Sequence, residues 1–123
     1  MEKEQKELLL KDLCARLPYG VKVVHKDENS KKDIITTLVG YNGHYAETFI
    51  DGLCYHLDLY EFKPFLRPMS KMTNSVYDEY LRIKTQGKLF EVIDWLNAHH
   101  FDYRGLIEKG LALEATKDMY NNK

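Results

Sequence analysis

The stretch that decides the fold runs from residue 33 to residue 60 and reads DIITTLVGYNGHYAETFIDGLCYHLDLY. Most of it consists of β-branched, aromatic and other apolar side chains, which favour an extended chain. Two dipeptides, Asn42-Gly43 and Asp51-Gly52, interrupt it. Both residues of Asn-Gly tolerate the positive φ of a type I′ turn, so we predict tight hairpins there. The predicted strands are residues 33–41, 45–50 and 53–60.

The segment before this stretch adds a strand and a helix. Residues 21–25 are a β-branched run and predict a first strand. Residues 3–17 place apolar side chains at the three-and-four spacing of an amphipathic helix, with Asp12 off the apolar stripe, and Pro18 ends the pattern. We predict that this helix covers a four-stranded antiparallel meander that is either open or curled towards a barrel.

The segment after the stretch predicts a loop and more helices. Prolines at 64 and 68 make residues 62–72 a crossing loop. Gly87 divides the following apolar-periodic segment into two helices, and Asp102 and Gly110 suit the start and the end of a short third helix. The predicted helices are residues 74–86, 88–99 and 103–109, followed by a frayed tail at 115–123. The helices are expected to pack on the sheet, which makes residues 1–123 a single α+β domain.

Composition and cysteine usage indicate an ordinary soluble protein. The chain has 123 residues, a formal net charge of −1 and 44% hydrophobic residues, which suit one domain with its own core. Cys14 and Cys54 lack a Cys-x-x-Cys spacing and are predicted to be reduced and buried. With no export signal and no apolar run of about 18 residues, the sequence predicts a cytoplasmic protein that does not enter membranes.

Charge is distributed unevenly along the chain. Residues 33–62 contain five acidic residues and no Lys or Arg, whereas residues 63–90 contain six basic residues and two acidic ones. The second block could bind nucleic acid with the help of its aromatic side chains, although a solvated helix face would have the same composition. The acidic first block would repel phosphates. Nucleic-acid binding is therefore an alternative function.

A metal-dependent enzyme is a second alternative. His99, His100 and Asp102 lie within four residues, but adjacent histidines on a helix point about 100° apart and do not readily share one ion. They suit the end of a helix, where they can satisfy free carbonyls. Cys54 and His56 alternate on one strand face, a pattern of low specificity. Nucleophile and phosphate-loop motifs are missing, so we assign no catalytic residue, cofactor or metal ligand.

The remaining interpretation is a non-enzymatic accessory module that binds another protein. Apolar side chains of the 62–72 loop either pin it to the body or, among basic neighbours, form a docking surface. Aromatic side chains and arginine make good interface anchors. The candidate partner-binding residues are Phe65, Arg67, Met69, Trp95, Tyr103 and Arg104.

Two segments carry a resemblance to known proteins. The runs Pro64–Thr73 (PFLRPMSKMT) and Asp94–Ala115 (DWLNAHHFDYRGLIEKGLALEA) resemble small uncharacterised proteins of Bacteroides-type gut bacteria and of their prophages or mobile elements. The resemblance covers most of the chain. It implies a cytosolic, phage-linked accessory protein, and it implies no activity, cofactor or catalytic residue.

Overall fold

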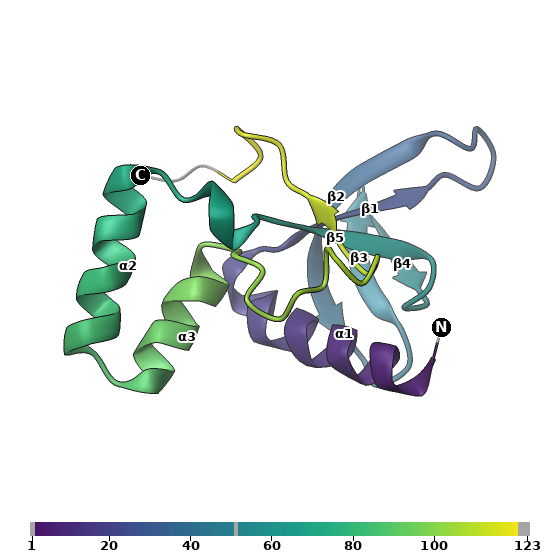
Figure 1. The fold of residues 1–123 in the computed structure, drawn as a ribbon. Helices are drawn as coiled ribbons and strands as arrows, with labels where there is room; N and C mark the ends of the chain where they lie inside the picture. The colour runs from purple at the N-terminus through teal and green to yellow at the C-terminus, as the bar shows by residue number, and fades with distance from the viewer. Residues whose placement is uncertain (1, 51, 121–123) are drawn as a thin grey trace.

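The computed structural model describes residues 2–50 and 52–120 and is an α+β structure (Figure 1). The helices are α1 (Lys3–Arg16), α2 (Asn74–Gln86) and α3 (Leu89–Ala98). The strands are β1 (Lys22–Lys26), β2 (Asp33–Tyr41), β3 (Ala46–Ile50), β4 (Leu53–Leu57), β5 (Phe62–Leu66) and β6 (Leu113–Glu114). Two short 3-10 turns are η1 (Leu17–Tyr19) and η2 (Met69–Lys71).

The strands form one open, mixed sheet in the order β4-β3-β2-β1-β5-β6. The first four strands make the predicted antiparallel meander. β5 then pairs with β1 in antiparallel fashion, and β6 pairs with β5 in parallel. The prediction of a four-stranded, wholly antiparallel sheet was therefore wrong in strand number and in orientation, and of the two predicted alternatives, open or curled towards a barrel, the sheet is open.

The predicted 62–72 loop contains strand β5. Pro64 lies in the middle of this strand opposite Val23, and it is fully buried. Pairing between β5 and β6 begins only at Phe65. The edge of β5 that faces β6 therefore needs no backbone N–H at Pro64, and for this reason a proline is tolerated there. The two prolines predicted a loop correctly only from Arg67 onwards.

The hairpin turns differ in detail from the prediction. Tyr41 pairs with Ala46, so four residues rather than two connect β2 to β3. Asn42 contributes through its side chain, which accepts hydrogen bonds from the backbone N–H groups of His44 and Tyr45 at 2.9 and 2.8 Å. In the next hairpin Ile50 pairs with Leu53, but Asp51 lies outside the described residues.

Helix α1 covers one face of the sheet, as predicted, but its buried stripe includes charge. The buried residues are Leu9, Asp12, Leu13 and Arg16, which follow the three-and-four spacing. Asp12 therefore lies on the stripe that it was predicted to avoid, and Cys14, which was predicted to be buried, is exposed. The charged pair is tolerated because Arg16 Nε donates to Asp12 Oδ2 at 2.8 Å within the same helix.

Helices α2 and α3 form a hairpin with its own apolar core. Figure 1 shows α1 lying along the strands, whereas α2 and α3 stand to one side of the sheet. The hairpin core is built around Val92, Trp95, Leu96 and Phe101 and is separate from the core between α1 and the sheet. The prediction that these helices pack on the sheet was wrong. Thr73 caps α2, and its hydroxyl accepts from Val76 N–H at 3.4 Å.

The predicted helix at 103–109 is a series of turns. Gly105 has a φ of 76°, a left-handed conformation that interrupts a helix. Asp102 nevertheless acts much like the predicted cap, because its two carboxylate oxygens accept from the N–H groups of Leu106 and Ile107, each at 2.9 Å. The segment is ordered by this carboxylate rather than by helical hydrogen bonds.

The described part of the C-terminal segment is anchored to the sheet. Ala115 N–H donates to the Leu66 carbonyl at 2.8 Å. The buried Tyr120 hydroxyl accepts from Lys22 N–H and donates to the Phe65 carbonyl, each at 2.7 Å. The predicted frayed tail was therefore wrong for residues 115–120, and residues 121–123 lie outside the described part.

Two further expectations concern solvent and membrane. Cys14 and Cys54 are free thiols, but both are exposed rather than buried. Among the residues that the structure describes, the helices are too short or too polar to span a membrane.

Candidate functional site

Three of the predicted partner-binding residues help to fill the interior. Phe65 and Trp95 are buried, and Trp95 Nε1 donates to Glu79 Oε1 at 3.1 Å across the hairpin. Met69 is half-buried against the hairpin core. These side chains are shared between segments of the same chain, so their binding to a partner stays a prediction.

Tyr103 and Arg104 belong to a polar junction between α1, α3 and the segment after α3. Arg104 Nε donates to Asp12 Oδ1 at 3.2 Å, and Arg104 Nη2 donates to the Tyr103 hydroxyl at 2.9 Å. The same hydroxyl donates to Asn97 Oδ1 at 3.0 Å. Arg16, which is fully buried, donates to the Phe101 carbonyl at 2.6 Å. The acidic group that pairs with Arg104 is therefore supplied by the chain itself.

Arg67 lines a groove of about 690 Å³ between η2, the start of α2 and residues 114–120. Its guanidinium donates to the Tyr120 carbonyl and lies 5.7 Å from the Phe101 ring centre. Burial lowers the pKa of Arg67 from its usual value. Nearby Lys71 lies 3.9 Å from Glu114. Two of the three basic residues that line this groove, Arg67 and Lys71, are therefore close to the protein's own carbonyl and carboxylate groups, and the third is Lys117.

His99 and His100 end α3 and do not converge on a ligand site. His99 Nδ1 lies 2.9 Å from the Trp95 carbonyl, and His100 Nε2 lies 3.0 Å from the Tyr19 carbonyl. His100 has a φ of 60° and stacks on Tyr120, with ring centres 3.9 Å apart. Burial, and next the positive charge of Arg16, lower the pKa of His100 to about 4. The pair lies at a helix end as predicted, but only the ring of His99 contacts a carbonyl of that helix, whereas the ring of His100 contacts a carbonyl of η1.

The turn end of the α2–α3 hairpin exposes large apolar side chains. We call residues 82–90 the hairpin tip. Leu89 and Phe90 are 76% and 59% exposed. The tip contains three basic residues, Arg82, Lys84 and Lys88, and no acidic residue. Exposed apolar side chains beside one sign of charge are typical of a docking surface.

The hairpin tip is held in place by the packing of α3 against α2. Val92 and Leu96 on α3 pack against Val76, Tyr80 and Ile83 of α2, whereas α2 itself has no fully buried residue. At the start of α3, Lys88 N–H donates to Glu91 Oε1 at 3.4 Å, and Glu91 N–H donates to the Lys88 backbone carbonyl at 3.0 Å. The first turn of α3 is therefore ordered while its apolar side chains face solvent.

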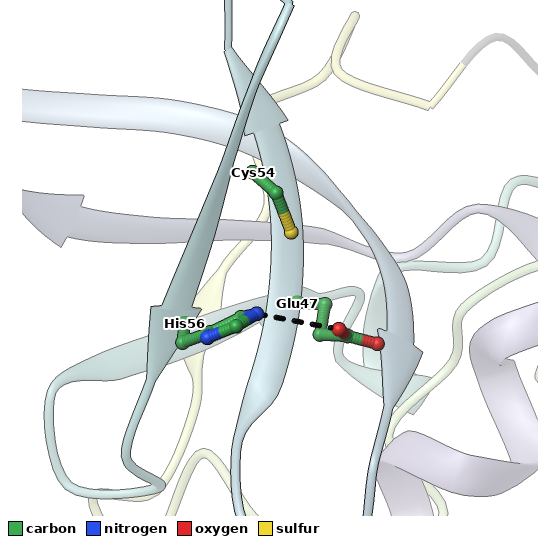
Figure 2. Close-up of side chains that lie close together, drawn as sticks. All are labelled: Glu47, Cys54 and His56. Carbon is green, nitrogen blue, oxygen red and sulfur yellow. Dashed lines mark ion pairs between the residues drawn. The ribbon is translucent and has the colours of Figure 1, made fainter.

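A second polar cluster lies on the outer face of the sheet. Glu47 on β3 pairs directly with His56 on β4, and Cys54 lies two residues before His56 on the same face (Figure 2). His56 Nε2 is 3.4 Å from Glu47 Oε2. The sequence indicated only the alternation of Cys54 and His56. Glu47 could not be added without the β3–β4 register.

Comparisons of the chain with protein-family models, with curated proteins and with solved structures found no match. The hairpin tip and the outer-face cluster are therefore interpreted from their own side chains.

Proposed function

We propose that this chain is a non-enzymatic binding module that docks a partner protein through its hairpin tip. The observation that carries the proposal is the exposure of Leu89 and Phe90 at the end of an ordered helical hairpin. Burying two such side chains in a partner stabilises a complex by about 1.5–3 kcal/mol each. A helical hairpin that already holds them in place loses little further entropy on binding.

The charges of the tip indicate what kind of protein partner would fit. Arg82, Lys84 and Lys88 are exposed in the tip, and Lys88 Nζ lies 5.9 Å from the centre of the Phe90 ring. A complementary partner offers an apolar pocket with a rim of Asp or Glu, which steers the encounter and excludes basic competitors. On the resemblance to proteins of Bacteroides-type bacteria and their prophages, we further propose the cytoplasm of such a cell as the setting.

Nucleic-acid binding is the alternative, and the structure divides the basic block on which it depended. Of its six basic residues, Arg67 is half-buried and donates to the Tyr120 carbonyl, and Lys71 lies near Glu114. Lys63 is exposed on strand β5, away from the tip in the sequence. The three residues of the tip remain together, but nucleic-acid recognition generally needs a larger basic patch. A protein partner therefore agrees better with the two apolar side chains at the centre of the tip.

The test is site-specific photo-crosslinking in native cells, with the crosslinker at position 89 of the full chain. We expect one discrete adduct that protease removes and nuclease leaves intact. The double variant Leu89→Ser/Phe90→Ser, with the crosslinker moved to position 85, should lose the adduct. Tyr60→Ser, which replaces an exposed aromatic residue outside the hairpin, should retain it. A nuclease-sensitive adduct would establish the alternative, and an adduct that survives the double substitution would contradict docking through the tip.

A further inference from the structure

The outer-face cluster of Glu47, Cys54 and His56 contains three different metal-binding groups on two rigid strands. The β3–β4 ladder is regular from Ala46↔Leu57 to Ile50↔Leu53, so the register fixes Glu47 opposite His56. Cys54 projects from the same face because side chains alternate along a strand. Figure 2 shows its sulfur directed towards the His56–Glu47 pair. A carboxylate, a thiol and an imidazole therefore face one another at the surface.

The spacing of the ligand atoms suits a tetrahedral metal ion. A zinc ion with Zn–N and Zn–O bonds of about 2.1 Å and a Zn–S bond of about 2.3 Å separates its ligand atoms by about 3.4–3.6 Å. His56 Nε2 and Glu47 Oε2 are 3.4 Å apart, which is one edge of that tetrahedron. The Cys54 sulfur lies within 4.8 Å of both other ligand atoms. A small rotation of an exposed side chain closes the remaining gap.

Neighbouring residues help to position two of the three groups, the His56 ring and the Glu47 carboxylate. Tyr45 stacks on the His56 ring, with centres 6.0 Å apart and planes inclined by 9°, and so restricts the ring. Gly40 lies opposite Glu47, and a Cβ atom there would come within 2.9 Å of Glu47 Oε1. The absence of a side chain at position 40 therefore leaves room for the Glu47 carboxylate over strand β2.

We propose that Glu47, Cys54 and His56 bind a divalent transition-metal ion of the Zn²⁺ type. The mixture of thiolate, imidazole and carboxylate suits this borderline ion and does not suit Mg²⁺ or Ca²⁺, which prefer oxygen ligands. Three protein ligands leave the fourth position to water or to a further ligand. Binding releases the thiol proton, so affinity falls as the pH is lowered. This site is independent of the hairpin tip and of the proposed docking.

Both cysteines are exposed, so Cys14 serves as an internal control for Cys54 within the wild-type protein. The test uses full-length, reduced, metal-free protein without a histidine tag, and it follows the alkylation of each thiol by mass spectrometry. One equivalent of Zn²⁺ should slow alkylation of Cys54 at least about tenfold, because a metal-bound thiolate is a poorer nucleophile, and should leave Cys14 unchanged. Equal rates at Cys54 with and without zinc, or equal slowing at both cysteines, would overturn the proposal.

A second measurement uses Co²⁺ as an optical probe of the ligands. Wild-type protein should bind one Co²⁺ with a thiolate-to-metal absorption band, which Cys54→Ser should abolish and Cys14→Ser should retain. Glu47→Gln should weaken binding at least about tenfold, and the matched His44→Ala, an exposed histidine outside the cluster, should not. The circular dichroism of each variant establishes that it is folded. Similar affinities for Glu47→Gln and His44→Ala would overturn the assignment of Glu47.

Discussion

At the scale of single residues, His100 shows how burial changes the chemistry of a side chain. Its ring lies between Tyr120 and the Tyr19 carbonyl, and its backbone adopts a left-handed conformation that most residues avoid. Phe101 N–H donates to the Leu96 carbonyl at 3.0 Å, and His100 N–H donates to the Asn97 carbonyl at 3.1 Å. This is the Schellman pattern that usually takes glycine, so the ring contacts compensate for the strain.

We expect His100 to make the protein less stable in acid. Its pKa is about 4 in the folded chain, against an ordinary value of 6.5. Between these values the unfolded chain binds the extra proton, so the free energy of unfolding falls as the pH decreases from 6.5 to 4. The stability that depends on a neutral His100 is fully present above pH 6.5. By pH 4, protonation in the unfolded chain lowers the free energy of unfolding by about 3 kcal/mol. Urea unfolding at a series of pH values measures this loss.

The control for the pH prediction is His100→Asn. Asparagine tolerates the left-handed conformation and does not titrate in this range. The variant should have a smaller decrease in stability between pH 6.5 and 4, whatever its stability at neutral pH. An unchanged pH dependence would show that other groups cause the acid sensitivity.

At the scale of elements, the junction of Asp12, Arg16 and Arg104 connects α1 to the segment after α3. Both carboxylate oxygens of Asp12 accept hydrogen bonds from guanidinium groups, and Arg16 extends the connection to the Phe101 carbonyl. Phe101 also belongs to the hairpin core. The orientation of the hairpin relative to α1 therefore depends on charged groups as well as on apolar packing.

Replacing Asp12 with Ala should destabilise the protein strongly. It leaves the fully buried Arg16 without a counter-charge, which typically costs about 3–5 kcal/mol. Chemical unfolding measures the difference, and Glu7→Ala, at an exposed position of the same helix, should change stability by less than about 0.5 kcal/mol.

The double variant Asp12→Leu/Arg16→Met separates loss of charge balance from loss of packing. It removes both buried charges, and Arg104 can reach solvent because its side chain is 20% exposed. We expect the double variant to be more stable than Asp12→Ala. A double variant that is equally unstable would mean that the junction acts through shape rather than through charge.

At the scale of the whole molecule, the protein contains two apolar cores that differ in how completely their side chains are buried. The core between α1 and the sheet contains several fully buried side chains, among them Leu9, Val23 and Leu66. The hairpin core is smaller, and no residue of α2 is fully buried. The strands of the sheet are also joined by a continuous ladder of hydrogen bonds. The hairpin contacts the sheet and α1 mainly at the end opposite the hairpin tip.

This difference predicts unequal local stability. Amide hydrogen exchange of α2 should be faster than that of β1 and the paired part of β2, because α2 can open with less loss of buried apolar surface. Native-state exchange at increasing denaturant measures the opening free energy of each amide. Equal opening free energies for α2 and β1 would show instead that the hairpin and the sheet unfold together.

Short-range patterns in the sequence predicted much of the fold. The bounds of β2 and α2, the bounds of α3 to within one residue at each end, the antiparallel order of the first four strands and the covering of the sheet by α1 all follow from local spacing and turn residues. These signals act within a few residues of chain, where propensity and periodicity determine conformation.

The tertiary structure decided what depends on residues far apart in the chain. β5 is a strand because β1 and β6 flank it, and Asp12 can be buried because Arg16 and Arg104 meet it. The metal-binding candidate needs Glu47 opposite His56, which the strand register sets. By itself the sequence determined the three long helices and the first four strands, with their periodicity. Which charges are buried, which apolar side chains stay exposed and which groups meet were decided only by long-range packing, because each depends on partners that no local pattern specifies.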